Sequence, residues 1–171
     1  MYMKKTKVML VIGILGIMIL AGTNTATACE LCGRWTGGGS VIDPIYGRVT
    51  HGFELHCNTD RLPNNLEVNW AGNHFHLGVL EYADCGDETY LNPEHPLAYC
   101  DWIYGEGVGK LNGVSNCHIK FYFTDDGEPG GHDYAHIRIF DQNGIKVLDI
   151  EGNLKMGNQQ AHRCTGIDAR I

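Results

Sequence analysis

The chain has 171 residues, a length that fits one globular domain, and its 13 Lys and Arg against 20 Asp and Glu give a formal net charge of −7. Nucleic acid and anionic membranes repel an acidic protein, which argues against both as partners. The charge suits a soluble extracellular protein or one that collects cations.

The first 28 residues have the pattern of a secretory signal peptide. Three lysines precede an apolar run at 8–20, and Ala-Thr-Ala at 26–28 offers a small-residue cleavage site before Cys29. The apolar run is shorter than the roughly 20 residues that a membrane span requires, so we expect no membrane span. Cleavage removes three basic side chains and no acidic one, which leaves ten basic and twenty acidic groups and a net charge of −10.

A lipid anchor is the alternative outcome of this leader, with Cys29 as the acylated residue. Such signals usually carry a large aliphatic residue three positions before the cysteine, where this chain has Ala26. The polar, Thr-rich residues 23–27 also separate the apolar run from Cys29. The sequence therefore favours secretion without a lipid anchor.

The cysteines indicate a fold held by disulfide bonds. All seven follow the signal, at positions 29, 32, 57, 85, 100, 117 and 164. Export makes disulfides the default, and an odd count leaves a free thiol, an intermolecular bridge or a lipidated Cys29. We favour Cys57 with Cys85, which would stabilise the fold by roughly 3 to 4 kcal/mol on the loop-entropy model. The other pairing stays open, and the candidate pairs are Cys100 with Cys117 and Cys32 with Cys164.

Alternation of apolar and polar residues predicts β-strands along the mature chain. A glycine run leads into a first strand at 40–42, and residues 49–57 alternate with His51 on the apolar side. A bent or edge strand is expected at 101–113, ending in a turn at Asn112-Gly113. The polar segment 58–65 and the acidic segment 84–96 are expected to be loops, and a last short strand is expected at 157–164.

Asn143-Gly144 is the strongest hairpin signal, because a two-residue type I′ turn needs positive φ at both central residues. The pairs that it predicts are Ile139 with Leu148 and Ile137 with Ile150 on an apolar face, and Arg138 with Asp149 and His136 with Glu151 on a charged face. Each pair contributes roughly 0.2 to 1 kcal/mol, and a slip of one residue loses them all. A turn at Ala71-Gly72 similarly predicts Val68 opposite Phe75, Leu66 opposite Leu77, Asn69 opposite His74 and Glu67 opposite His76.

These elements predict an all-β fold without helices. About eight short strands with turns at fairly even spacing are typical of an antiparallel β-sandwich or jelly roll, here with disulfides. The expected organisation is a signal peptide at 1–28, a short N-terminal segment at 29–36, a β-sandwich domain at 37–164 and a C-terminal tail at 165–171.

Six short motifs run in order along the chain: GGGSV at 37–41, RVTHGFELHC at 48–57, PNNLEVNWAGNHFHL at 63–77, LNGV at 111–114, FTDDGEPG at 123–130 and GNQQAH at 157–162. Together they resemble the post-choice-of-anchor domain of secreted and surface proteins of bacteria and archaea. The resemblance implies a compact extracellular module with no assigned activity. It also supports the pairing of Cys57 with Cys85.

A histidine-bearing face is the first candidate site. The residues that could converge on Zn²⁺ or Cu²⁺ if their strands are neighbours are His56, Glu67, His74 and His76. The alternative is cross-strand hydrogen bonding without metal, between Glu67 and His76 and between Asn69 and His74. The sequence holds no H-E-x-x-H or comparable local metal motif.

The acidic segment 125–133 is the second candidate site. Its carboxylates, on Asp125, Asp126, Glu128 and Asp133, are the hard oxygen ligands that Ca²⁺ prefers, and its glycines permit tight wrapping. It lacks the ligand spacing of an EF-hand. A solvated hairpin loop that uses Asp and Gly for turn geometry is the competing interpretation.

A third candidate is a platform for sugar rings built from Trp70, Tyr99, Trp102 and Tyr104, against core packing as the default for such residues. No nucleophile elbow, P-loop or dinucleotide motif supports an enzyme. The sequence thus favours a secreted, non-enzymatic module of the cell surface or medium, with a structural, adhesive or binding role toward a surface polymer or protein. The alternative is a protein that binds Zn²⁺, Cu²⁺, Ca²⁺ or carbohydrate.

Overall fold

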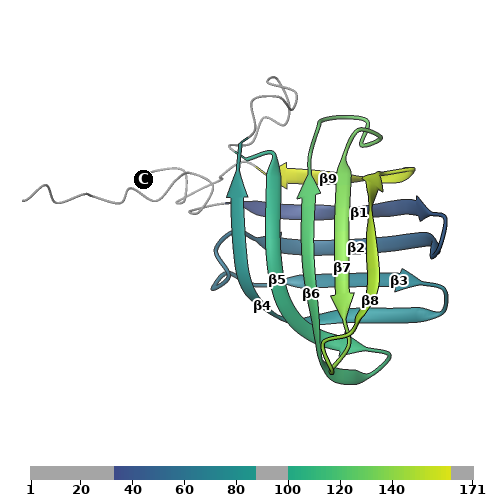
Figure 1. Cartoon of the computed structure of the whole chain (residues 1–171). Helices are drawn as coiled ribbons and strands as arrows, with labels where there is room; N and C mark the ends of the chain where they lie inside the picture. Colours follow the sequence, from purple (N-terminus) through teal and green to yellow (C-terminus); the bar gives the residue numbers. More distant parts are fainter. Residues whose placement is uncertain (1–32, 88–99, 163–171) are drawn as a thin grey trace, which may run out of the picture.

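The structure is a computed structural model that describes residues 33–87 and 100–162. These residues form nine β-strands in a single antiparallel sheet with the order β8-β7-β6-β5-β4-β3-β2-β1-β9 (Figure 1). The strands are β1 (Arg34–Asp43), β2 (Gly47–His56), β3 (Asn65–Trp70), β4 (Asn73–Gly86), β5 (Trp102–Leu111), β6 (Val114–Thr124), β7 (Tyr134–Phe140), β8 (Lys146–Asn153) and β9 (Met156–His162). The described ranges hold no helix with the length and apolarity needed to cross a membrane.

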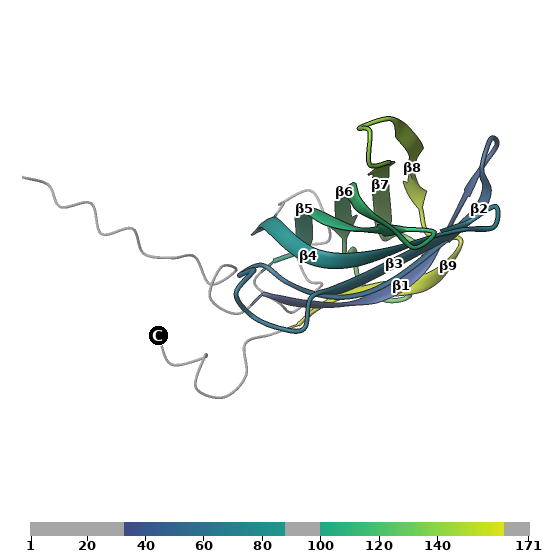
Figure 2. The same cartoon turned by 90° about the horizontal axis from the view of Figure 1, so that it is seen from below.

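The sheet curls into a half-barrel. Strands β5 to β8 cross over β1, β2, β3 and β9, and β4 curves from one half into the other (Figures 1 and 2). The β4–β5 ladder shifts register between Leu77 and Val79 and again between Leu80 and Tyr82. Bulges of this kind bend a strand and increase its twist, so they place the curl in β4. The two edge strands, β8 and β9, follow each other in the chain, so the curl brings the ends of the sheet together.

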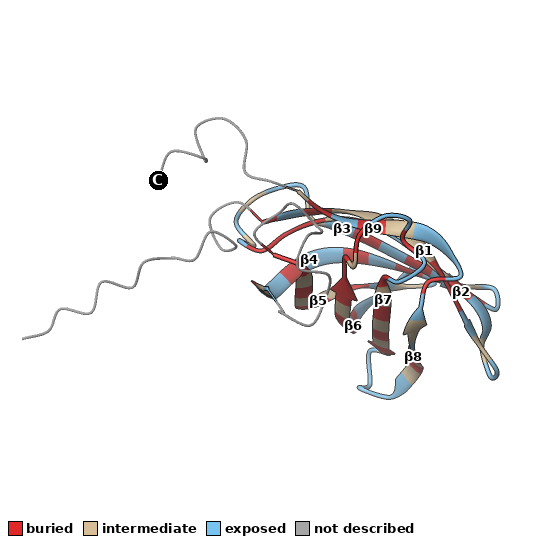
Figure 3. Ribbon diagram, turned by 90° about the horizontal axis from the view of Figure 1, so that it is seen from above, coloured by how far each residue is buried: buried red, intermediate tan, exposed pale blue. Residues whose placement is uncertain are grey.

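The core lies between the two facing halves. Buried and partly exposed residues alternate along β5, β6 and β7 (Figure 3), as the period of two in a strand requires. The rings of Phe53 and Phe123 stack 4.7 Å apart between centroids, and those of Phe121 and Phe123 stack 5.0 Å apart. Gly105 makes room for this stack, since a Cβ there would lie 2.3 Å from the ring of Phe121.

The all-β, antiparallel architecture is confirmed. The prediction of a sandwich or jelly roll is not confirmed, because all nine strands belong to one sheet. The first strand is also longer than expected, since β1 begins at Arg34, before the domain boundary placed at 37.

The β7–β8 hairpin keeps the predicted register but not the predicted turn. All four predicted pairs are present, from Ile139–Leu148 to His136–Glu151. Only Gly144 has positive φ, at 78°, and its N–H donates to the carbonyl of Asp141. The loop is therefore a type I turn followed by a left-handed glycine, with a register shift between Ile139 and Phe140 that compensates for the extra loop residue.

The β3–β4 hairpin closes at Ala71-Gly72 as expected, and the φ angles of 43° and 80° make the turn type I′. The pairs Val68–Phe75, Asn69–His74 and Glu67–His76 are confirmed. Leu66 and Leu77 lie beyond the paired residues, and both are buried. Asn112 and Gly113 also have positive φ, 52° and 84°, which confirms the turn between β5 and β6.

The disulfide between Cys57 and Cys85 is confirmed, with Cα atoms 5.8 Å apart. The pairing of Cys100 with Cys117 is wrong, because Cys117 is a buried free thiol and Cys100 is disulfide-bonded. Cys100 precedes the first residue of β5, whereas Cys117 faces Gly109 near the other end of that strand, so about 30 Å of extended chain separates them. The predicted pair Cys32–Cys164 lies outside the described residues, as does Cys29.

The double substitution C57A/C85A should lower the free energy of unfolding by about 3 to 4 kcal/mol, because the disulfide closes a loop of 28 residues. Urea unfolding under non-reducing conditions measures this loss. Cys117→Ala is the matched control and should cost only about 1 kcal/mol, since it removes a buried thiol without opening a loop. Equal stability of C57A/C85A and the wild type would contradict the assignment.

Candidate functional site

The outer face of the β3–β4 hairpin brings together a carboxylate and two imidazoles. Glu67, His74 and His76 are exposed, and their ligand atoms lie within 4.8 Å of one another. In the part of the chain that the structure describes, this is the one group of three or more His, Cys, Asp or Glu side chains with such spacing. The histidines alternate with the buried Phe75 along β4, so the period of a strand puts both on one face.

Each histidine of this group has a cross-strand hydrogen bond. His74 Nδ1 lies 2.8 Å from Asn69 Oδ1, and His76 Nδ1 lies 3.3 Å from Glu67 Oε1. These are the two pairs expected from the alternative without metal. Both bonds use Nδ1, and Nε2 of neither ring has a hydrogen-bond partner among the described residues.

His56, which was predicted to join this group, does not. It lies on the part of β2 that pairs with β1, opposite Arg34, beyond the last β2–β3 pair at Glu54. Its ring is buried, and its Nδ1 lies 3.1 Å from the carbonyl oxygen of Pro63 in the following loop. The prediction of His56 as a ligand is wrong because the loop after β2, not the hairpin, surrounds its side chain.

The β6–β7 loop contains two buried carboxylates with a structural role. Asp125 accepts N–H groups of Gly127 at 3.1 Å and Ala161 at 2.8 Å. Asp133 accepts N–H groups of Asp126 at 3.0 Å and Gln159 at 2.7 Å. Two of these donors belong to the outer edge of β9, whose other edge pairs with β1. The carboxylates therefore cap an edge strand whose backbone N–H groups would otherwise be unpaired.

The four carboxylates proposed for Ca²⁺ do not converge as a ligand group in the described residues. Asp125 and Asp133 are committed to backbone N–H groups, and Glu128 Oε1 accepts a hydrogen bond from Asn158 Nδ2 at 2.8 Å. The loop thus agrees with the competing interpretation, in which the Asp side chains stabilise the loop, rather than with a calcium-binding site.

A buried histidine adjoins these carboxylates through Gln159. His51 lies on the apolar side of β2 as predicted, and its ring stacks 5.0 Å from that of Phe123. Its Nε2 lies 2.9 Å from Nε2 of Gln159, and because an amide NH₂ group only donates, the imidazole Nε2 is the acceptor. The backbone N–H of the same Gln159 binds Asp133. Sequence reasoning missed Gln159, which had no signal beyond its place in the motif at 157–162.

His51 and Asp133 have opposite pKa shifts. Burial lowers the pKa of His51 to about 4. Burial also raises the pKa of Asp133 to about 7, and the charges of Asp125 and Glu128 act in the same direction, whereas the two backbone N–H groups oppose the shift. Between about pH 4 and 6.5 the folded protein therefore carries a proton on Asp133 and the unfolded chain carries one on His51.

The outer face of β4 to β7 carries a cluster of aromatic side chains. Trp102 and Tyr122 lie 6.0 Å apart between centroids, Tyr122 and Tyr134 6.4 Å, and Tyr82 and Tyr104 6.1 Å. We call these five residues the outer aromatic cluster. Of the residues predicted for a sugar platform, Trp102 and Tyr104 belong to it. Trp70 is in the core and Tyr99 lies outside the described residues.

Charged groups adjoin the outer aromatic cluster. Lys120 Nζ lies 2.8 Å from Glu106 Oε1, which also accepts a hydrogen bond from the hydroxyl of Tyr104. These bonds lower the pKa of Glu106, and burial, followed by this same bond, raises the pKa of Tyr104 to about 12. A depression of about 340 Å³ beside them is lined by Glu81, Glu106, His118, Lys120 and Phe140, among others.

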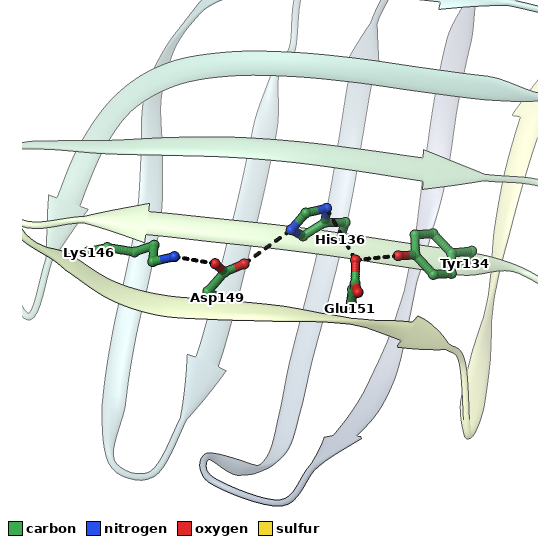
Figure 4. A network of polar contacts seen from close by, with 5 residues as sticks. All are labelled: Tyr134, His136, Lys146, Asp149 and Glu151. Carbon is green, nitrogen blue, oxygen red and sulfur yellow. Dashed lines mark hydrogen bonds and ion pairs between the residues drawn. The ribbon is translucent and has the colours of Figure 1, made fainter.

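A polar network continues this face across β7 and β8 (Figure 4). His136 Nε2 lies 3.1 Å from Asp149 Oδ1, and Lys146 contacts the other carboxylate oxygen. The hydroxyl of Tyr134 donates to Glu151 Oε2 at 2.7 Å. Burial opposes ionisation of Asp149, but the bonds from Lys146 and His136 outweigh it and lower the pKa of this carboxyl. The charges are paired, so the face is polar without a strong excess of either sign.

Comparisons of the chain with models of protein families, with curated proteins and with solved structures give no match. The resemblance to the post-choice-of-anchor domain therefore stays a prediction.

Asp133→Asn and His51→Phe should change the pH dependence of stability in opposite directions. The folded pKa of His51 is depressed, so its contribution is lost as pH falls from 6.5 toward 4. The folded pKa of Asp133 is raised, so its contribution is lost as pH rises from about 4 through 7. Relative to the wild type, Asp133→Asn should add a slope of up to about +1.4 kcal/mol per pH unit, and His51→Phe a slope of up to about −1.4.

Urea unfolding at pH 4.5, 5.5 and 6.5 measures these slopes, and the exposed Asp60→Asn serves as the control with the wild-type slope. If both test variants also keep the wild-type slope, then His51 does not lose a proton and Asp133 does not gain one when the chain folds.

Proposed function

We propose that this protein is a secreted, non-enzymatic module that works outside the cell. The observation that carries the proposal is the disulfide between Cys57 and Cys85. Cys100 is also disulfide-bonded. Such bonds persist in oxidising compartments and are rare where thiols are kept reduced. The leader pattern at 1–28 and the acidic charge point in the same direction.

A structural or binding role agrees with where the perturbed groups lie. Asp133 and His51, whose pKa values are shifted to about 7 and about 4, are buried and bonded within the fold, so they serve folding rather than an open site. Several polar side chains of the outer face are paired with one another, among them Glu106 with Lys120 and His136 with Asp149, which suits contact with a partner surface. The carboxylate caps on β9 also cover a sheet edge that could otherwise pair with another chain.

Expression of the full chain in a bacterial host with a Sec pathway should release a protein that begins at Cys29, because Ala28 ends the small-residue cleavage site. Intact mass and N-terminal sequencing of the exported protein measure this. An added diacylglycerol mass on Cys29 would show that the protein is lipid-anchored rather than freely secreted. Retention of Met1 in the cytoplasm would refute the proposal.

The outer aromatic cluster favours a second candidate function, binding of a neutral polysaccharide. Aromatic rings on an open sheet face offer apolar surface to the faces of sugar rings, and adjoining charged groups offer hydrogen bonds to hydroxyls. Trp102, Tyr104 and Tyr122 are partly exposed and lie on adjacent strands, and Glu106 forms an ion pair with Lys120. The exposed Asp84 stands opposite Tyr104 on β4, so a neutral chain fits this face better than an anionic one.

Trp102→Ala and Tyr122→Ala should each weaken binding of a neutral glycan at least tenfold, which equals about 1.4 kcal/mol of lost stacking. A glycan array identifies the ligand, and calorimetry with the corresponding oligosaccharide measures the affinity. Ile45→Ala, which removes an exposed apolar side chain far from the cluster in sequence, is the control and should bind like the wild type. Absence of binding at millimolar oligosaccharide would exclude this function.

A further inference from the structure

We propose that Glu67, His74 and His76 form a binding site for a divalent transition-metal ion of the Zn²⁺ or Cu²⁺ type. The three ligand atoms already lie within 4.8 Å of one another, and tetrahedral zinc needs them about 3.3 to 3.6 Å apart at metal–ligand distances of about 2.0 to 2.2 Å. All three side chains are exposed, so rotation about their own χ angles can close this difference without moving the backbone.

The backbone of the hairpin places the ligands closely. The N–H of His74 donates to Asn112 Oδ1, at 2.9 Å, and so points away from β3. Asn69 and His74 are therefore a pair without backbone hydrogen bonds, and so are Glu67 and His76 two residues further on. Side chains in such pairs stand closer together than in hydrogen-bonded pairs. The type I′ turn at Ala71-Gly72 holds this register.

Asn69 prepares the ring of His74 for a metal. An amide oxygen only accepts, so Nδ1 of His74 must donate to Asn69 Oδ1, and the neutral ring then carries its free electron pair on Nε2. Histidines that bind metals commonly donate their other ring N–H to an oxygen in this way, which sets the tautomer and the ring orientation. Asn69 is thus a positioning residue, and His74 Nε2 is the ligand atom.

Glu67 and His76 can exchange their contact for a metal at low cost. Their hydrogen bond of 3.3 Å is longer than the usual 2.7 to 3.2 Å for N–H···O, and both partners are exposed. An exposed pair of this kind contributes at most about 1 kcal/mol. Two imidazoles and one carboxylate match the preference of Zn²⁺ and Cu²⁺ for nitrogen with one hard oxygen, and water fills the remaining position.

The surroundings leave one side of the site open. Opposite Glu67 on β2 stands Gly52, where an added Cβ would meet no atom closer than 4.0 Å. On the other side, Lys110 of β5 stands opposite His76 and is the one cationic residue directly paired with the group in the described sheet. Its positive charge weakens metal binding, so Lys110→Gln should strengthen it.

Titration of the purified mature protein with ZnCl₂ or CuCl₂, after treatment with a chelator and its removal, tests the proposal by calorimetry. We expect one ion per chain, tighter binding of Cu²⁺ than of Zn²⁺, and no binding of Ca²⁺ or Mg²⁺. His74→Ala and His76→Ala should each weaken binding at least tenfold. Lys110→Gln should tighten it two- to fivefold, and Asn69→Ala should weaken it two- to tenfold without abolishing it.

His118→Ala removes an exposed strand histidine outside the group and should leave the affinity within twofold of the wild type. Circular dichroism checks that each variant is folded, which the exposure of these side chains favours. No saturable binding at 100 μM metal would overturn the proposal. Equal losses in His118→Ala and His76→Ala would also overturn it, because they would indicate diffuse binding to surface histidines.

Discussion

Two buried carboxylates tie the edge strand β9 to the loop between β6 and β7. The chain makes a simple up-and-down meander from β1 to β8, and only β9 returns to pair with β1. On the edge of β9 that does not pair with β1, Asp125 accepts the N–H group of Ala161 and Asp133 accepts that of Gln159. A hydrogen bond of this kind contributes roughly 0.5 to 1.5 kcal/mol to a neutral acceptor and roughly 1.5 to 3 kcal/mol to a charged one, and a buried N–H left without a partner costs roughly 1 to 3 kcal/mol. The half-barrel therefore depends on a loop that lies at the end of two other strands.

Burial of Asp133 makes stability depend on pH, and His51 offsets this dependence. Burial of Asp133 outweighs its two hydrogen bonds, so the carboxyl keeps its proton up to about pH 7. His51, linked to the same Gln159, has lost its proton in the core. Over the mildly acidic range the two changes cancel in the proton balance of folding. The fold thereby buries two titratable groups whose opposite contributions to the pH dependence of stability cancel over this range.

The alternation of side chains predicted the strands and their pairing but not the curvature. Apolar faces identified Ile137 and Ile139 as inward residues, and the partners followed from the register. The turn at Asn143 differed because Asp141 Oδ1 accepts the N–H groups of Asn143 and Ile145, which stabilises a longer loop. A compensating bulge restored the register, so the pairing was right although the turn was wrong. The curl depends on bulges in β4, which a period of two does not reveal.

The candidate sites likewise differ in whether local strand pairing or the curl of the sheet brings their residues together. Glu67, His74 and His76 were predictable because a two-residue turn and the pairing rule bring them together within ten residues of sequence. The caps on β9 were not, because Asp133 and Gln159 are separated by 26 residues and meet only once the sheet has curled. His56 failed as a ligand because β2 runs past the end of β3, where a loop surrounds its ring.

The histidine group depends on the turn chemistry of its hairpin as much as on its ligands. The left-handed conformations of Ala71 and Gly72 set the pairing of Glu67 with His76, and one inserted residue would move one strand by a full register step. His74 and His76 would then stand opposite apolar residues of β3, such as Val68, rather than Asn69 and Glu67, and the ligand set would be lost although every ligand was still present. Burial of Val68 and Phe75 opposes such a slip, since it would carry the buried residues of one of the two strands into water. The same core that specifies the fold thus also specifies the outer site.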